Sequence, residues 1–237
     1  LRTTVELIGQ VKANLAPILD QRGILNNLHR QSGAPLAPGT IVEIYGSDLA
    51  GGQAQPGLEG GRLPDTFNNV SVLVGSTRAP LYFLSSGQIN AQLPFELKPD
   101  EQYPVVVRSG GAFSVAERIS MAPVRPGLAA FDDGRVIAQD EGFQLITDAN
   151  PARRGRFIIL YLVGMGATSP SVATGAQSPA TTLATVTEAP QVTIDGKTAR
   201  TVFAGLTPLS VGLYQINVEV PQDAAAGLRP LVVTQGD

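Results

Sequence analysis

The sequence predicts an all-β protein built from two tandem β-sandwich modules. The chain has 237 residues and 43% of them are apolar, so two modules of ordinary domain size could each bury a core. It also contains 26 glycines and 18 prolines, which are too many chain breakers for a helical bundle but fit short strands joined by turns. Finally, several strand-like segments occur twice along the chain, which indicates a duplicated unit.

In the first half, β-branched and aromatic residues form short runs that end at turn residues. Residues 40–45 read Thr-Ile-Val-Glu-Ile-Tyr between two glycines, a pattern typical of a strand. Strands separated at this spacing by Gly, Pro and Ser favour a sandwich. The other predicted strands are 70–74, 81–84, 89–93, 105–107 and a last strand in which Phe113, Val115, Ile119 and Met121 share one face.

The internal repeat is the observation on which the module prediction depends. Gln-Ile-Asn-Ala-Gln-Leu-Pro at 88–94 recurs as Gln-Ile-Asn-Val-Glu-Val-Pro at 215–221. Because loops tolerate insertion better than strands, a duplicated β-module should keep its strand cores and vary its loops. The further matching pairs are 104–107 with 230–233, 74–83 with 194–203 and, more loosely, 39–46 with 155–164.

The repeat places the module boundary in the segment Ala-Pro-Val-Arg-Pro-Gly at 122–127, where two prolines favour an extended, stiff connector. After it, Asp-Asp-Gly at 132–134 predicts a hairpin turn. Residues 169–187, rich in Ser, Thr, Ala and Pro, predict a long surface loop. The expected organisation is an N-terminal extension or tail of a preceding module at 1–23, a first sandwich at 24–123 and a second sandwich at 124–237.

The N-terminal extension allows two interpretations. Apolar residues over 5–19 fit a helical stripe, whereas residues 3–9 fit equally well a strand that ends at a glycine. Pro17 and Gly23 limit any helix. Because the chain opens at Leu1 without an initiator methionine, we expect it to be a fragment of a longer protein.

Composition excludes several classes of function. The net charge is −3 and no basic stripe is present, which argues against nucleic-acid binding. No cysteine is present, so disulfides, thiolate nucleophiles and cysteine-ligated metals are excluded, and either a reducing cytosol or a bacterial surface remains compatible. No signal peptide is visible, and no apolar run reaches the roughly 18 residues of a membrane span, so no membrane insertion is expected.

Two motifs could be mistaken for catalytic or nucleotide-binding elements. The only histidine, His29, precedes the first predicted strand and is expected to be solvated, not the base of a Ser-His-Asp arrangement. One histidine without cysteine also leaves the usual zinc sites short of ligands. Gly-Met-Gly-Ala-Thr at 164–168 resembles a phosphate-binding loop but lacks the third glycine and the following helix, so it predicts a turn at a strand end.

Five acidic residues crowd one short stretch of the second half. Carboxylates at turns can bind calcium, which takes six to eight oxygen ligands, but no regular calcium loop is present and turn formation is the favoured interpretation. A glycosidase needs two carboxylates that face one cleft, and no pair stands out. The five residues are Asp132, Asp133, Asp140, Glu141 and Asp148.

The repeated Gln-Ile-Asn segments are expected to have a structural role. Strand alternation should turn Ile89 and Ile216 inward and leave the flanking amides on the other face, where they could bond the backbone of a neighbouring loop. Aromatic residues make up 5% of the chain and no Trp is present, which argues against a sugar-stacking platform. The tyrosines expected in the core or at corners are Tyr45, Tyr82, Tyr161 and Tyr214.

Several motifs in combination carry a resemblance to known families. They are Ala-Pro-Gly-Thr-Ile-Val-Glu-Ile-Tyr-Gly-Ser-Asp-Leu-Ala at 37–50, the two Gln-Ile-Asn segments, Ala-Asn-Pro-Ala at 149–152, Phe-Ala-Gly-Leu-Thr-Pro at 203–208 and Val-Gly-Leu-Tyr at 211–214. Over about 24–237 the chain resembles an uncharacterised repeat domain at the C-termini of secreted proteins from Solibacter-type acidobacteria. More distantly, residues 38–46 are similar to the first strand of the immunoglobulin-like TIG domains of cell-surface receptors. The resemblance implies two immunoglobulin-like sandwiches, an extracellular or cell-surface location and no catalytic residues.

The expected function is therefore a non-catalytic spacer or interaction module of a secreted or cell-surface bacterial protein, with an adhesive role. The alternatives are a carbohydrate- or protein-binding module with a specific site and an accessory domain of an extracellular hydrolase. Contacts to a surface protein or a glycan would come from the loops at 51–69 and 169–187. No catalytic, cofactor-binding or metal-binding residue is assigned, and no cofactor is expected.

Overall fold

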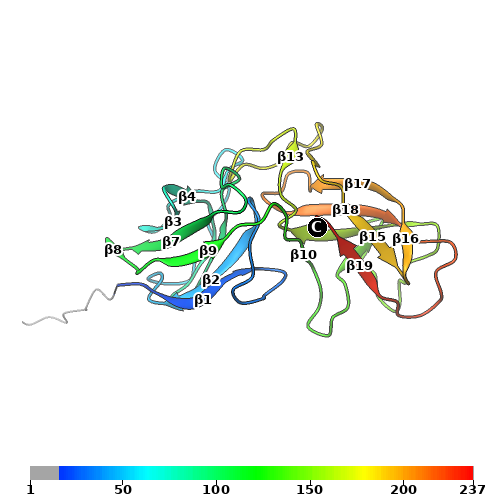
Figure 1. Cartoon of the computed structure of the whole chain (residues 1–237), viewed down its shortest axis with the longest axis horizontal. Coiled ribbons are helices and arrows are strands. Elements are labelled where there is room, and N and C mark those ends of the chain that lie inside the picture. The colour runs from blue at the N-terminus through cyan, green and yellow to red at the C-terminus, as the bar shows by residue number, and fades with distance from the viewer. Residues whose placement is uncertain (1–15, 237) are drawn as a thin grey trace, which may run out of the picture.

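The computed structural model describes residues 16–236, and these residues contain strands and turns but no helix. The predicted fold class is confirmed: two immunoglobulin-like β-sandwiches follow one another along the longest axis of the molecule (Figure 1). Within the described residues no helix is long and apolar enough to span a membrane. The strand interpretation of residues 3–9 and the helical stripe as far as residue 15 lie outside the described part of the chain. Ile18 and Leu19, the last two residues of that predicted stripe, lie in a β-strand and not in a helix.

The first module packs a four-stranded sheet against a five-stranded one. The first sheet has the order β1-β2-β6-β5; the second has the order β4-β3-β7-β8, with β9 also paired to β7. The strands are β1 (Ile18–Asn26), β2 (Ile41–Ser47), β3 (Val70–Val74), β4 (Thr77–Ala79), β5 (Leu81–Leu84), β6 (Gln88–Gln92), β7 (Gln102–Ser109), β8 (Ala112–Phe113) and β9 (Glu117–Ser120).

The second module repeats this plan with a larger and a smaller sheet. The larger has the order β10-β12-β18-β17-β14-β13, with β11 paired to β12, and the smaller has the order β16-β15-β19. The strands are β10 (Gly127–Leu128), β11 (Ala138–Asp140), β12 (Phe157–Val163), β13 (Thr168–Ser169), β14 (Thr185–Val186), β15 (Gln191–Ile194), β16 (Lys197–Ala199), β17 (Thr201–Leu206), β18 (Tyr214–Glu219) and β19 (Leu231–Thr234).

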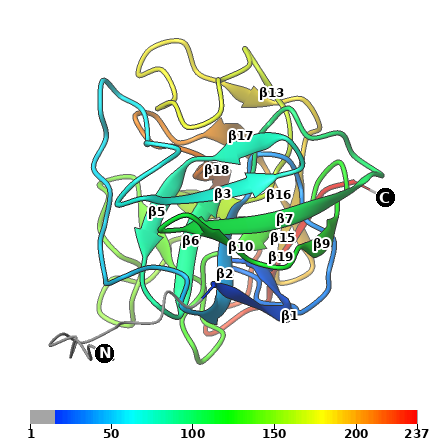
Figure 2. The ribbon, with the colours of Figure 1, turned by 90° about the vertical axis from the view of Figure 1, so that its left-hand side faces the viewer.

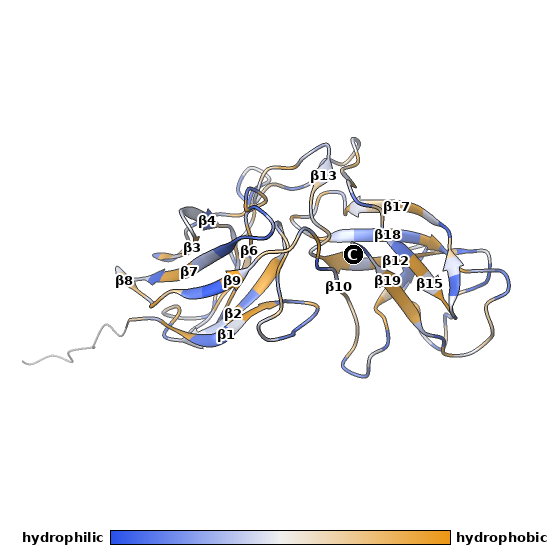
Figure 3. Cartoon of the chain, viewed as in Figure 1, coloured by the Kyte–Doolittle hydropathy of each residue, from blue (hydrophilic) through white to orange (hydrophobic). Residues whose placement is uncertain are grey.

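Each module has its own hydrophobic cluster, filled by the inward residues of both of its sheets. The first cluster draws on residues 24–121 and the second mainly on residues 128–233, with Phe95 of the first module against its edge. Ile89 and Ile216 are fully buried at equivalent positions, as strand alternation predicts. Figure 3 shows the resulting alternation of hydrophobic and hydrophilic residues along strands such as β2, and Figure 2 shows the second module behind the first when the molecule is viewed from its end.

Strand β1 extends the first sandwich upstream of residue 24. It begins at Ile18, which pairs with Ser47, and Leu19 pairs with Gly46. The ladder is then interrupted and resumes at Ile24, since Arg22 has a φ of +55°. Residues 18–23, predicted to belong to an extension or a preceding module, therefore form part of the first sheet.

The prediction of one continuous last strand in the first module was wrong. The chain forms the short strands β8 and β9 instead, because the pairing register with β7 shifts by one residue between them, and at this point the Ser114 hydroxyl accepts a hydrogen bond from Val107 N–H at 3.0 Å. Phe113 and Val115 are consequently exposed, whereas Ile119 and Met121 enter the core. The other predicted strands of this module are observed.

Candidate functional site

The two modules meet through loops that the sequence predicted to be free surface loops. We call residues 172–178 of the second module the strap and residues 59–63 of the first module its seat. Leu63 N–H donates to the Gly175 carbonyl at 2.9 Å, and Gln177 N–H donates to the Gly61 carbonyl at 2.9 Å. Arg62 and Ala176 form an antiparallel bridge between these bonds. The strap is thus held on the first module as a short antiparallel ladder.

The buried side-chain amide of Gln92, at the end of β6, forms a hydrogen bond with the backbone of the strap. Gln92 has no exposed surface, and its Oε1 accepts a hydrogen bond from Gly175 N–H at 2.7 Å. Gly175 has a φ of +79°, and a Cβ atom there would lie 2.8 Å from Pro80 Cγ. The position therefore requires glycine for its backbone conformation and for the close approach of Pro80.

Thr174 anchors the strap through its side chain and its backbone. Its hydroxyl accepts a hydrogen bond from Phe95 N–H at 2.8 Å and donates to Glu96 Oε2 at 2.7 Å. Its carbonyl accepts from Arg62 Nη2 at 2.7 Å. One threonine of the second module is therefore held by three groups of the first.

A second loop of the second module reaches the same face of the first module. The Tyr82 hydroxyl donates to the Val211 carbonyl, and burial raises the pKa of this phenol, so it remains a donor at ordinary pH. Gly212, with a φ of +64°, lies so close to Gln92 that a Cβ atom would be 2.8 Å from its Nε2. The strap and this loop together enclose the end of β6.

The glycine loop at 164–168 has a structural role at the connector. It joins β12 to β13 with no following helix, which confirms the predicted strand-end turn. Arg125 N–H donates to the Gly164 carbonyl at 2.8 Å, and a Cβ atom on Gly164 would lie 2.5 Å from the Arg125 carbonyl. Gly166 approaches the Pro123 carbonyl equally closely, at 2.6 Å from such a Cβ atom. These glycines allow the connector to lie flat against the second module.

The connector is also attached to the first module. Asn26 is 4% exposed, and its Nδ2 donates to the Arg125 carbonyl at 3.2 Å while its Oδ1 accepts from Leu28 and His29 N–H, both at 3.0 Å. A Cβ atom on Gly127 would lie 2.4 Å from that same Oδ1. The connector is thus fixed on both sides.

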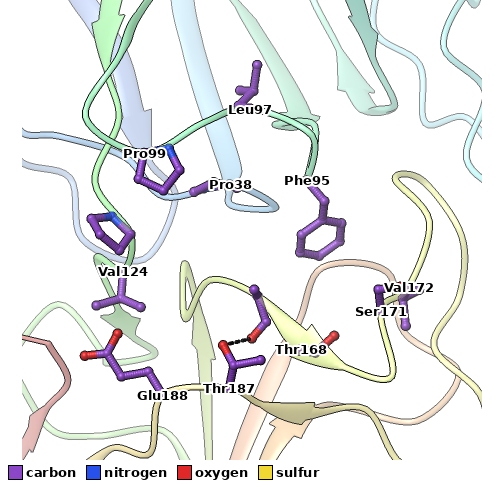
Figure 4. Close-up of a pocket in the computed structure, with 12 residues that line it drawn as sticks. Pro38, Phe95, Leu97, Pro99, Val124, Thr168, Ser171, Val172, Thr187 and Glu188 are labelled. Carbon is purple, nitrogen blue, oxygen red and sulfur yellow. Dashed lines mark hydrogen bonds between the residues drawn. The ribbon is translucent and has the colours of Figure 1, made fainter.

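A cavity of about 280 Å³ lies between the modules beside the connector (Figure 4). Its lining is mostly apolar, and Glu188 is its one titratable residue. It brings no nucleophile next to a base, so its chemistry is that of an apolar gap with one carboxylate at its edge. The lining includes Pro38, Phe95, Leu97, Pro99, Val124 and Val172.

The acidic stretch forms turns in the structure. Asp140 accepts hydrogen bonds from Asn150 Nδ2 at 2.9 Å and from Gly142 and Gln144 N–H at 2.8 and 3.0 Å. These bonds, that from Asn150 foremost, hold the pKa of Asp140 below its usual value. Glu141 forms an ion pair with Arg156. Residues 16–236 contain no group of three or more His, Asp or Glu side chains placed to hold a metal ion.

The remaining sequence candidates separate into solvated, buried and outer-face positions. His29 is exposed, and its Nε2 lies 3.3 Å from Gln31 Oε1. Tyr214 is buried in the core, as predicted, and its hydroxyl donates to the Gly166 carbonyl. Tyr45 and Tyr161 were expected in the core or at corners, but they lie half-buried on outer sheet faces because Ile44 and Leu160 beside them occupy the inner faces.

The two outer faces carry the same arrangement of side chains. Tyr45 pairs with Gln88, and Tyr161 pairs with Gln215, at equivalent registers. The amides bond each other and not a neighbouring loop, since Gln88 Nε2 donates to Asn90 Oδ1 at 2.7 Å and Gln215 Nε2 donates to Asn217 Oδ1 at 3.1 Å. The duplication therefore preserved an outer polar and aromatic patch as well as the core, a pattern that the sequence prediction missed.

The comparison with family models agrees with the fold of the first module. Residues 24–120 match the sequence profile of the IPT/TIG domain family, so the predicted TIG resemblance is confirmed for the first module. Domains of this family are generally non-catalytic interaction or structural modules. No curated protein matches the sequence. Among solved structures, the full extracellular region of plexin A4 is similar at 13% identity over 93% of this chain and 17% of its own length, with a TM-score of 0.31.

Proposed function

We propose that this chain is a rigid two-module spacer and interaction unit of a secreted or cell-surface protein, with no catalytic activity of its own. The domain type of residues 24–120 supports a non-catalytic role. The motifs that could have indicated a nucleotide-binding or metal-binding site have structural roles. The glycine loop packs closely against the connector, and the acidic residues form turns. The bacterial origin, the closer likeness to the Solibacter-type repeat and the boundaries at 24–123 and 124–237 stay predictions.

The observation that carries this proposal is the fixed junction. A simple flexible linker would leave the two sandwiches free to reorient, which is the ordinary expectation for tandem domains. Here the connector is bonded on both sides, and Gln92, Thr174 and Tyr82 each span the junction with hydrogen bonds. A spacer needs this property because it must hold the groups at its two ends at a constant separation.

The experiment measures the distance distribution between spin labels on the two modules. The chain contains no native cysteine, so Arg118→Cys on β9 and Val202→Cys on β17 give two unique exposed labelling positions. We expect one narrow distance population by double electron–electron resonance. Broad distances in the otherwise unmodified protein would refute a rigid junction.

Glycine substitutions provide a matched comparison in the same assay. Gly175→Ala places a methyl group 2.8 Å from Pro80 Cγ and should broaden the distribution. Gly196→Ala imposes similar backbone strain, since φ is +71° there, but the added methyl meets no atom within 4 Å. It should leave the distribution narrow. Equal behaviour of the two variants would contradict the assignment of the junction to the strap.

A second candidate function is carbohydrate binding, and the repeated outer patch is the observation that favours it. Aromatic rings beside paired amides offer the stacking and hydrogen-bonding groups that sugars use. Binding of a glycan array by the parent protein, lost in a Tyr45→Ala, Tyr161→Ala double variant and kept in Phe113→Ala, would support this function. No binding by the folded parent protein would exclude carbohydrate binding for the glycans sampled.

An accessory role beside a hydrolase stays a prediction that the full-length sequence would test.

A further inference from the structure

A second cavity, of about 400 Å³, lies in the second module between the loop that follows β11 and the first residues of β12. Its volume is in the range of small-ligand sites. The connector contacts the opposite end of β12 at Gly164, and Gln235 bonds the Met165 and Glu188 carbonyls beside that end. The cavity is therefore separated from the junction by the length of the strand. Its lining combines charged and amide groups with apolar side chains.

The carboxylates of this cavity are already bonded to donors of the protein itself. Asp140 accepts hydrogen bonds from two backbone N–H groups of its loop and from Asn150 Nδ2. Glu141 accepts a hydrogen bond from Phe157 N–H at 2.9 Å through Oε1 and forms an ion pair with Arg156 through Oε2. Each of the carboxylate oxygens thus has a donor, and both acids serve to hold the loop in place.

The groups of the cavity that remain free are a cation and an amide oxygen. Among residues 16–236 no carboxylate lies within ion-pair distance of Arg153. The guanidinium therefore keeps its N–H donors for a ligand. Asn150 is oriented by its Nδ2, which donates to Asp140 Oδ2 at 2.9 Å and to the Leu145 carbonyl at 3.2 Å. Its Oδ1 receives no hydrogen bond from the described residues and remains an acceptor.

We propose that this cavity binds an acidic sugar, such as a uronic acid residue of a polysaccharide. The carboxylate of the sugar would form a bidentate ion pair with Arg153, and a ring hydroxyl would donate to Asn150 Oδ1. The apolar C–H face of the ring would pack on Pro151 and Ala152, which also line the cavity. An acidic peptide side chain offers the carboxylate but has no hydroxyl for Asn150, so the sugar matches the free groups better.

The experiment is a titration of the isotope-labelled chain with trigalacturonate, followed by NMR. We expect saturable shifts of the Asn150, Arg153 and Phe157 amides. The methyl ester of the same trisaccharide keeps the rings but removes the charge. It should bind about tenfold or more weakly, because a hydrogen bond to a charged group is lost. Triglutamate keeps the carboxylates but lacks the hydroxyls, and it should also bind about tenfold or more weakly.

Protein variants locate the binding in the cavity. Arg153→Gln should weaken trigalacturonate binding about tenfold or more. Arg154→Gln is the matched control, because it removes the same charge from the next residue, which does not line the cavity. It should leave binding within about twofold of the parent, since exposed charges are screened by salt. Ala152→Phe fills the cavity from an exposed position without a change of charge and should weaken binding about tenfold or more.

Several results would overturn the proposal. They are no saturable shifts in the folded parent, equal losses in Arg153→Gln and Arg154→Gln, unchanged binding by Ala152→Phe, and equal binding of the ester and the acid. Triglutamate binding as tight as that of trigalacturonate would overturn it too, because the ligand would then be an acidic peptide. The label distances that test the rigid junction are measured without sugar, so a failure here leaves the spacer proposal unaffected.

Discussion

Replacing Gln92 by leucine tests whether the strap contributes to stability. Leucine is close in size and suits a position with no exposed surface, so the main change is loss of the acceptor for Gly175 N–H. Gly175 is buried, and a buried donor left without a partner costs about 1–3 kcal/mol. The Gln92 Nε2 contact to the Gly39 carbonyl is long, at 3.5 Å, and should add little. We therefore expect a loss of about 1–3 kcal/mol.

The assay is urea unfolding followed by circular dichroism, with calorimetry to resolve the transitions of the two modules. Gln102→Leu is the matched control, because it makes the same chemical change at an exposed position and should alter stability by no more than about 0.5 kcal/mol. Faster proteolysis within residues 172–178 should accompany the loss in Gln92→Leu. If Gln92→Leu and Gln102→Leu unfold alike and the strap stays protected, the amide does not hold the strap.

Three further predictions concern the connector, the acidic turn and the second core. Gly164→Ala should destabilise the protein by more than about 1 kcal/mol in urea unfolding, because φ is +80° there and the new methyl group would lie 2.5 Å from the Arg125 carbonyl. The control is Gly134→Ala, where φ is +84° but the methyl group would meet open space, so the loss of stability should be smaller. Asn150→Ala should raise the pKa of Asp140 in an NMR titration, because it removes the foremost bond that lowers it. The stabilisation linked to the parent Asp140 is present above its usual pKa of 3.8 and is lost as the pH falls through the lower folded-state value, and the variant should lack part of this acid sensitivity. Ile216→Ala should cost about 2–5 kcal/mol in calorimetry, because it empties a fully buried site.

The sequence was most informative where the pattern is local. The alternation around Ile89 and Ile216, the turn at Asp132-Asp133-Gly134 and the strand-end glycine loop are each set by neighbouring residues. They could be predicted because side-chain period and turn chemistry act over a few positions. The β8–β9 region was predicted less well, since the Ser114 bonds to Val107 depend on how a chain folds back and not on alternation.

The junction could not be predicted for the same reason. Nothing near Gln92 in the sequence indicates that its amide meets Gly175, because the two residues are 83 positions apart. The glycines at 175 and 212 were a weak signal, since a positive φ in a loop has many causes.

By itself, the sequence determined the all-β class, the duplication and the inward and outward faces of the strands, because composition and period-two alternation decide which surfaces must be buried. Only the tertiary structure decided that residues 59–63 and 172–178, both in predicted surface loops, pair with each other. This contact depends on which distant backbone groups find partners, and hydrogen bonding between remote segments leaves no periodic trace in the chain.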